Sequence, residues 1–235
     1  MTGAPMALAA LAVLTVIGAG WLWVRWWDAR RRRQMAALAA SMGLAYSPDD
    51  PVDIPGRYGQ LRALGWGYYR QAFNVIRGQF RGREVLAFDY IYKTQEQGGK
   101  SRQTYHISVA LVPCACRFPG LLVRPEGLLD RLAAAVGLED VDFESHEFSK
   151  RFCVLAADRK FAYGVIVPQM MEYLLANPGW AIELNGPAAA IHTGSIWKIE
   201  RFGPALEVLS GFLDRVPDHV WKELGAERAP EPAGG

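Results

Sequence analysis

The feature that most constrains this chain is an apolar run from Ala4 to Val24, which contains no charged side chain. As a helix rising about 1.5 Å per residue, the run would reach roughly 31 Å, close to the thickness of a hydrocarbon core. Aromatic and basic residues typical of a membrane interface occupy its end and the positions after it: Trp21, Trp23, Trp26, Trp27, Arg30, Arg31, Arg32 and Arg33. We therefore expect residues 1–27 to be a transmembrane anchor, with the lipid bilayer as a partner.

The charges beside this run predict its orientation. No basic residue precedes it, whereas Arg25 and the block Arg30–Arg33 follow it, offset only by Asp28. Because basic flanks stay in the cytoplasm, we expect a single-pass protein of the plasma membrane with its N-terminus outside and the remaining chain in the cytoplasm. A cleaved signal peptide is the alternative, but it would need a positive N-terminal region and a shorter apolar core.

The composition of the remaining chain limits the classes of function. Five of the 26 basic residues and one of the 24 acidic residues lie in the first 33 positions, so the rest carries a net charge near −2. A nucleic-acid-binding protein would need a basic face, so we expect no nucleic-acid partner. The three cysteines cannot form a closed disulfide framework.

Local patterns divide the chain into five segments. The first half predicts a three-stranded antiparallel meander over 73–80, 84–93 and 104–112, because β-branched and aromatic residues dominate these stretches. The meander and the later helices together predict an α+β fold, in which an antiparallel sheet packs with helices. The expected segments are an anchor (1–27), a juxtamembrane helix (28–43), a Pro/Gly-rich lead-in (44–67), a cytoplasmic α+β domain (68–224) and a disordered tail (225–235).

The second half alternates helical and extended patterns. An apolar stripe from Phe202 to Val216 predicts the last major helix. The other elements expected are a helix from Pro125 to Gly137, a strand over 147–155, a helical stretch capped by Asp158 and restarted at Pro168, a hairpin of 180–184 with 188–192 around Asn185-Gly186-Pro187, and a short helix capped by Asp218.

No motif carries a clear catalytic signature. Gly98-Gly99-Lys100-Ser101 resembles the end of a phosphate-binding loop, but a strand follows it where such a loop needs a helix. Cys114 and Cys116 lack the second ligand pair of a structural zinc site. The alternating Asp140, Asp142, Glu144 and His146 are a candidate cation site or a solvated face. We expect no cofactor and no metal.

Several stretches resemble a group of uncharacterised bacterial single-pass membrane proteins with a cytoplasmic domain of unknown function. They are Phe88-Asp89-Tyr90-Ile91-Tyr92-Lys93-Thr94, with Asn74–Gly78 upstream and Val141–Glu144 and Glu147-Phe148 downstream. The resemblance implies the same architecture, an anchor followed by a cytoplasmic domain, and it implies no catalytic residues.

We expect a membrane-anchored interaction or sensing domain rather than an enzyme, because tethering raises the effective concentration for other membrane-associated proteins. Asp89, Tyr90 and Tyr92 are the candidate contact surface. The alternatives are a membrane-tethered hydrolase or metal-dependent enzyme near Asp140–His146, and a lipid-surface binding module beside the arginine block.

Overall fold

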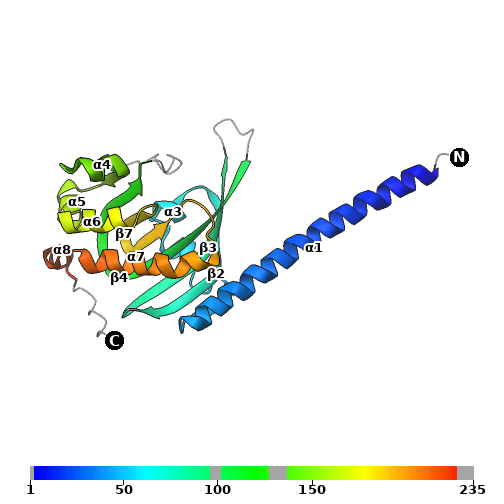
Figure 1. Ribbon diagram of the computed structural model, residues 1–235, viewed down its shortest axis with the longest axis horizontal. Coiled ribbons are helices and arrows are strands. Elements are labelled where there is room, and N and C mark those ends of the chain that lie inside the picture. Colours follow the sequence, from blue (N-terminus) through cyan, green and yellow to red (C-terminus); the bar gives the residue numbers. More distant parts are fainter. Residues whose placement is uncertain (1–2, 96–101, 127–136, 227–235) are drawn as a thin grey trace.

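The N-terminal part of the chain is one long helix. The computed structural model describes residues 3–95, 102–126 and 137–226, and only the backbone at positions 3–13, 16, 17 and 24. Helix α1 (Gly3–Ser41) projects away from the folded body (Figure 1). Gly43, with φ of 67°, follows its end in the left-handed conformation expected of a C-terminal cap. Among the described residues, no helix has the length and apolar character needed to cross a membrane, so they do not support the expected transmembrane helix.

Among the side chains described in α1, the buried ones all lie in the last third of the helix. Arg31, Met35 and Ala39 are buried, and their spacing of four residues places them on one face of the helix. The side chains described before Arg31 are exposed. The folded body therefore begins at Arg31, within the segment predicted as a juxtamembrane helix.

Seven antiparallel strands form one sheet in the described part of the chain. The strands are β1 (Ala45–Asp49), β2 (Tyr68–Phe80), β3 (Arg83–Gln95), β4 (Arg102–Pro125), β5 (Glu139–Asp140), β6 (Phe152–Ala156) and β7 (Ala181–His192). The order is β1-β2-β3-β4-β6-β5, and β7 pairs with the other edge of β4. The predicted meander is confirmed as β2, β3 and β4.

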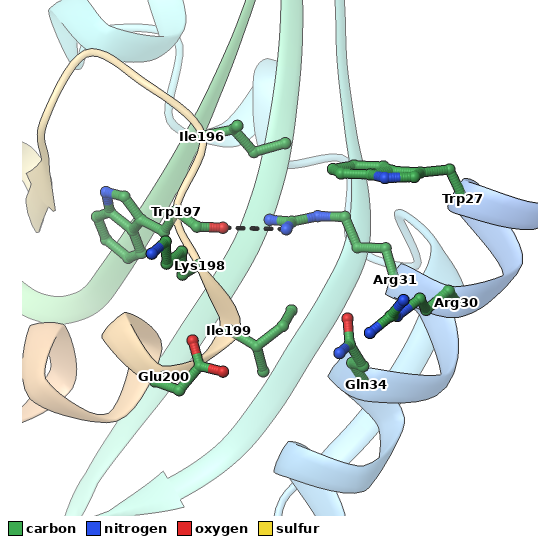
Figure 2. A pocket seen from close by; sticks show the side chains of 9 residues that line it. All are labelled: Trp27, Arg30, Arg31, Gln34, Ile196, Trp197, Lys198, Ile199 and Glu200. Carbon is green, nitrogen blue, oxygen red and sulfur yellow. Dashed lines mark hydrogen bonds between the residues drawn. The ribbon is translucent and has the colours of Figure 1, made fainter. Parts of the chain in front are cut away.

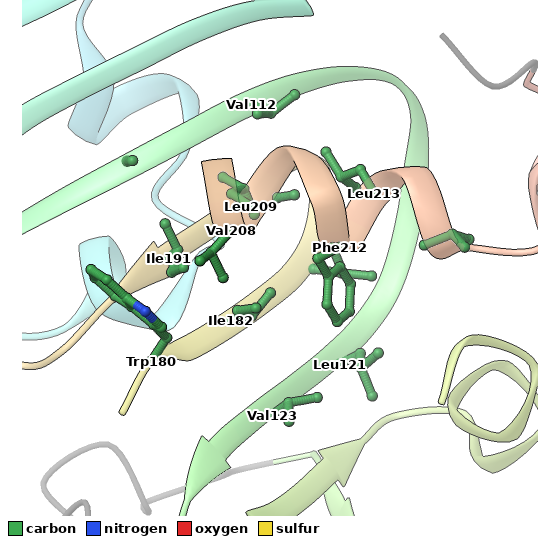
Figure 3. Packing of buried hydrophobic residues seen from close by; sticks show 14 of the residues in the cluster. Val112, Leu121, Val123, Trp180, Ile182, Ile191, Val208, Leu209, Phe212 and Leu213 are labelled. Carbon is green, nitrogen blue, oxygen red and sulfur yellow. The ribbon is translucent and has the colours of Figure 1, made fainter. Parts of the chain in front are cut away.

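Strand β4 organises the sheet because it pairs with β3, β6 and β7 along its 24 residues. Figure 3 shows β4 curving around β7. The predicted hairpin at 180–192 is wrong, since residues 181–192 form the single strand β7. Gly186, with φ of 56°, lies opposite Phe118 where the register shifts, so the glycine forms an irregularity in one strand instead of a turn between two.

The helices of the second half cover one face of the sheet. They are α4 (His146–Arg151), α5 (Arg159–Val165), α6 (Pro168–Ala176), η2 (Ile199–Arg201), α7 (Phe202–Arg215) and α8 (Asp218–Glu223). Asp158 caps α5 as predicted, and the apolar stripe of α7 packs on Val112 and Ile182 of the sheet (Figure 3).

Two predictions in this half need correction, and one cannot be compared. The strand expected over 147–155 begins only at Phe152, because Ser145 caps α4 by accepting a hydrogen bond from the Phe148 amide. Pro217, not Asp218, is the N-cap of α8. Pro125 ends β4, and most of the helix expected after it lies outside the described residues.

The lead-in closes the opposite face of the sheet. Besides β1, residues 44–67 contain the short helices α2 (Ile54–Arg57) and α3 (Arg62–Gly65). Ile54 and Leu64 pack against Phe88 in a second apolar cluster on that face. The α+β fold class is confirmed, and both faces of the sheet are covered.

Candidate functional site

The site is built around Asp89 in the middle of β3. Strand alternation directs Asp89 to the same face as Val85 and Ala87, toward the helical layer, and no part of it is exposed. A carboxylate in such a position needs charged or hydrogen-bonding partners, because burial otherwise penalises its charge heavily.

Arg31 of α1 supplies the main partner. Its Nε donates to Oδ2 of Asp89 and its Nη2 to Oδ1, both at 2.7 Å. This paired geometry is the strongest arrangement available to a guanidinium and a carboxylate. Arg31 Nη1 also donates to the carbonyl oxygen of Trp197 at 3.0 Å (Figure 2). One side chain thus fixes α1 to the sheet and to the segment after β7.

Asn74 and Ser108 complete the coordination of Asp89. Asn74 Nδ2 donates to Oδ2 at 2.9 Å, and Ser108 Oγ donates to Oδ1 at 2.7 Å. Asn74 lies in an irregular part of β2 with φ of 52°, a left-handed conformation that asparagine tolerates better than most residues. Tyr46 of β1 donates its hydroxyl to Oδ1 of Asn74 at 3.0 Å. The cluster therefore connects four adjacent strands with α1.

Trp197 holds the segment between β7 and α7. Its backbone N–H donates to Ser108 Oγ at 3.0 Å, and its indole N–H donates to Thr193 Oγ1 at 2.9 Å. Its buried ring packs edge-on against Trp180 and Phe202. Segment 193–201 is consequently fixed in position relative to α1.

A cleft of about 340 Å³ lies between α1 and this segment. It is lined by Trp27, Arg30, Arg31, Gln34, Ile196, Trp197, Lys198, Ile199 and Glu200 (Figure 2). Trp27 and Ile196 are 48% and 38% exposed, so each presents apolar surface to solvent. Arg30, Lys198 and Glu200 are also exposed, and the lining therefore combines apolar and charged groups.

A second hollow lies over the lead-in, beside Asp50, Asp53, Arg57 and Arg70. Two of its carboxylates already have structural roles. Asp50 accepts hydrogen bonds from the Val52 and Ile54 amides, and Asp53 caps α2 through the Gly56 amide. These contacts define the path of the lead-in and give this hollow no evident chemistry.

Two buried ionisable groups lie near opposite ends of β7. Glu183 accepts hydrogen bonds from the Arg62 amide at 2.8 and 2.9 Å, and burial raises its pKa to about 7. His192 Nδ1 accepts from the Gly194 amide at 3.2 Å, and burial lowers the pKa of this side chain to about 4. Neither lines the cleft between α1 and residues 196–200.

The predicted contact surface needs correction. Asp89, Tyr90 and Tyr92 are all buried, so they cannot receive a partner in this structure. Tyr90 points to the face opposite Asp89, where its hydroxyl donates to the Leu64 carbonyl at 2.6 Å. Tyr90 and Tyr92 are buried in the apolar cluster on that face, and Asp89 is buried beneath Arg31 on the other.

The predicted membrane-interface residues divide into two groups. Arg31 is turned inward to Asp89, so it does not face lipid. The others are exposed, namely Trp21, Trp23, Trp26, Trp27, Arg30, Arg32 and Arg33. Their contact with a bilayer remains a prediction.

The remaining candidate residues do not form a site in the described part of the chain. Asp140, Asp142, Glu144 and His146 are exposed, while the intervening Val141 is buried. Within the described ranges, no three His, Cys, Asp or Glu side chains are grouped so that they could hold a metal ion. Burial raises the pKa of the Cys114 thiol to about 12, which disfavours its reactive thiolate. Residues 98–101 lie outside the described part of the chain.

Sequence reasoning missed the pairing of Arg31 with Asp89, although two signals pointed to it. Asp89 interrupts the apolar face of a strand, and Arg31 shares a helix face with Met35 and Ala39. Considered separately, Arg31 and Asp89 are each compatible with a position on the surface. Only the docking of α1 on the sheet brings them together.

Comparison with solved structures shows a likeness in fold. No family model and no curated protein matches the chain. The fold is similar to the crystal structure of the mycobacterial trehalose monomycolate transport factor A, TtfA, with a TM-score of 0.60 and 14% sequence identity. The match covers 79% of this chain and 96% of TtfA. At this identity, the likeness concerns the fold alone.

Proposed function

We propose that this chain is a membrane-anchored accessory protein of lipid transport, which acts by contact with lipid and with another membrane-associated protein and not by catalysis. The amino-acid sequence of the apolar run Ala4–Val24 supports the anchor. The structure leaves many of the side chains in this run undescribed. The basic flank supports a cytoplasmic position for the folded body. The fold shared with a lipid transport factor supports the lipid-related role.

The observation that carries the proposal is the rigid attachment of α1 to the sheet. Arg31 lies seven residues after Val24 in the same continuous helix, a distance of about 10 Å along the axis. Since Asp89 holds Arg31 on two oxygens, no flexible linker separates the folded body from the proposed span. The body would be kept within reach of other membrane components, where weak contacts gain from a high effective concentration.

The same geometry argues against the enzyme alternative. The acidic residues from Asp140 to His146 are exposed and make no enclosed site. Glu183 and His192, whose pKa values are shifted by burial, lie near opposite ends of β7. Each accepts a hydrogen bond from a backbone amide, that of Arg62 for Glu183 and that of Gly194 for His192. The lipid-surface alternative, by contrast, is favoured by the cleft beside Trp27 and Arg30.

A deletion strain of the native host tests the proposed role. We expect loss of the gene to change the distribution of a lipid between the inner and outer layers of the envelope, measured by lipid extraction and mass spectrometry. The full chain should restore the wild-type distribution, and so should a chain whose Ala4–Val24 run is replaced by an unrelated span. An unchanged lipid distribution in the deletion strain would contradict the role in lipid transport.

Truncation tests the importance of the anchor. A chain lacking residues 2–24 keeps Arg31 and should be stable but unable to restore the lipid distribution. Removal of residues 1–33 is unsuitable, because it would leave Asp89 without its arginine. Restoration by the truncated chain would show that anchoring is unnecessary. Reporters fused after Gly235, active only inside or only outside the cell, test the orientation independently.

A further inference from the structure

We infer that the cleft between α1 and residues 196–200 binds the anionic headgroup of a phospholipid from the membrane that holds α1. This inference rests on the proposed anchoring and adds a ligand class and a site to it. The argument uses the position of the cleft, its charge and its size.

The position places the Trp27 end of the cleft at headgroup level. Trp27 and Arg30 follow Val24 by about 4.5 and 9 Å along the helix axis. The polar layer of a bilayer extends about 5 to 7 Å beyond each side of its hydrocarbon core, so Trp27 lies within this layer. Arg30 lies about 2 Å beyond it, where its long side chain can still reach a headgroup phosphate. Trp27 lies toward the N-terminal end of the cleft beside Ile196, and Gln34 lies toward the other end beside Ile199 (Figure 2). The apolar end of the cleft therefore faces the proposed span.

The charge favours an anion. Arg30 and Lys198 are exposed, and neither forms an ion pair with another described residue. The Arg30 guanidinium lies 5.4 Å from the centroid of the exposed Trp26 ring, a contact that leaves its charge without a counterion. Arg31 is already neutralised by Asp89, so it contributes structure and not binding charge. Glu200 is the single acidic side chain in the lining. Two available cations against one carboxylate leave an excess of positive charge at the cleft.

The size suits a headgroup. A volume of about 340 Å³ lies at the lower end of the range for small-molecule sites. It accommodates a glycerol phosphate group, whereas two acyl chains would not fit within it. The chains would leave past Trp27 and Ile196, which together form the exposed apolar end. The cleft thus matches a lipid that remains in the bilayer while its phosphate contacts Arg30 and Lys198.

The test uses the full chain in nanodiscs made of equal parts of phosphatidylglycerol and phosphatidylcholine. Native mass spectrometry of the released protein measures which lipid stays bound, and hydrogen exchange reports protection of residues 196–200. We expect one retained phosphatidylglycerol with a preference of about 30-fold, which corresponds to roughly 1 kcal/mol for each of two basic residues. The double variant Arg30→Gln/Lys198→Gln should lose both the preference and the protection.

The matched control is Arg32→Gln/Arg33→Gln, which removes the same charge from exposed positions that do not line the cleft. It should keep the preference. If the two double variants lose the preference for phosphatidylglycerol equally, the preference comes from general attraction between basic residues and the anionic membrane surface, which would overturn the site. Equal retention of phosphatidylcholine by the wild-type chain would also overturn it. Protection of residues 196–200 by inorganic phosphate alone would overturn it too, because the ligand would then be a soluble phosphate and not a lipid headgroup.

The result is separable from that of the proposed function. A chain that enters nanodiscs but shows no preference would overturn the headgroup site and leave the anchor and the transport role standing. A chain that fails to enter nanodiscs would overturn the anchor and the headgroup site together.

Discussion

Arg31 of α1 and Asp89 of β3 are 58 positions apart in the sequence, yet Nε of the arginine lies 2.7 Å from Oδ2 of the aspartate in a nearly solvent-free contact. Asn74 and Ser108 satisfy the remaining acceptor positions of the carboxylate. The pair determines where the N-terminal helix leaves the folded body, and hence how that body would be held at a membrane.

Arg31→Ala should destabilise the folded body by about 3–5 kcal/mol, because it leaves Asp89 buried without a countercharge. Denaturant unfolding of the full chain in detergent, followed by tryptophan fluorescence, measures the change. Arg33→Ala is the control, since Arg33 is exposed and should change stability by less than about 0.5 kcal/mol. Similar losses in both variants would contradict a special role for Arg31.

Replacing both partners distinguishes pairing from mere burial. Arg31→Met/Asp89→Leu removes both charges and should recover most of the stability lost in Arg31→Ala, because well-packed apolar groups can substitute for a buried pair. The same unfolding measurement applies. The single variants Arg31→Met and Asp89→Leu are measured as well. If the loss in the free energy of unfolding of the double variant equals the sum of the losses of the two single variants, the two residues act independently.

Asn74→Ala should cost more stability than Asn74→Gly, although both lose the hydrogen bond to Asp89. The backbone φ of 52° strains alanine by about 1 kcal/mol, whereas glycine adopts it freely. The difference between the two variants in the free energy of unfolding therefore isolates the strain. Equal stabilities would show that β2 relaxes at this position.

The pH dependence of stability should contain two opposing contributions. The pKa of Glu183 rises from 4.5 to about 7 on folding, so its contribution is present below pH 4.5 and is lost as pH rises to 7. The pKa of His192 falls from 6.5 to about 4, so its contribution is present above pH 6.5 and is lost as pH falls to 4. Between pH 4.5 and 6.5, the two slopes should largely cancel.

Single variants should expose each slope. In Glu183→Gln, the remaining His192 should make stability rise with pH by about 1.4 kcal/mol per unit between pH 4.5 and 6.5, relative to wild type. In His192→Gln, stability should fall with pH by a similar amount. Unfolding midpoints measured across this range test both. Parallel pH profiles for wild type and Glu183→Gln would refute the assignment to Glu183.

Phe212→Ala in α7 should destabilise the fold by about 3–5 kcal/mol, since its fully buried ring fills the space between α7 and the sheet (Figure 3). Phe212→Leu should cost less, because more of the apolar volume is kept. Chemical unfolding at constant pH measures both. An alanine variant no less stable than the leucine variant would contradict this account of the core.

Local patterns predicted much of the fold. The three meander strands followed from β-branched and aromatic residues between polar turns, and α7 followed from an apolar stripe with helical spacing. Asp158 caps a helix because its side chain can accept from nearby amides regardless of the rest of the chain. Such features depend on neighbours within a few residues.

Other elements depended on partners distant in the sequence. Asn185-Gly186-Pro187 has the composition of a turn, but pairing with the long strand β4 keeps residues 181–192 in one strand. The lead-in contains prolines and glycines typical of a loop, yet Ile54 and Leu64 are buried because a second sheet face needs covering. Local composition could not anticipate either result.

The candidate site shows the same division. By itself, the sequence determined the α+β class, the meander strands and the proximity of exposed tryptophans and arginines to an apolar run, because these follow from residue type and short-range period. Only the tertiary structure decided that Arg31 turns inward while Arg30 lines a cleft, and that Asp89 is a buried anchor point instead of a contact surface. The physical reason is that burying a charge is tolerable only with its partner in place, and that partner is 58 positions away.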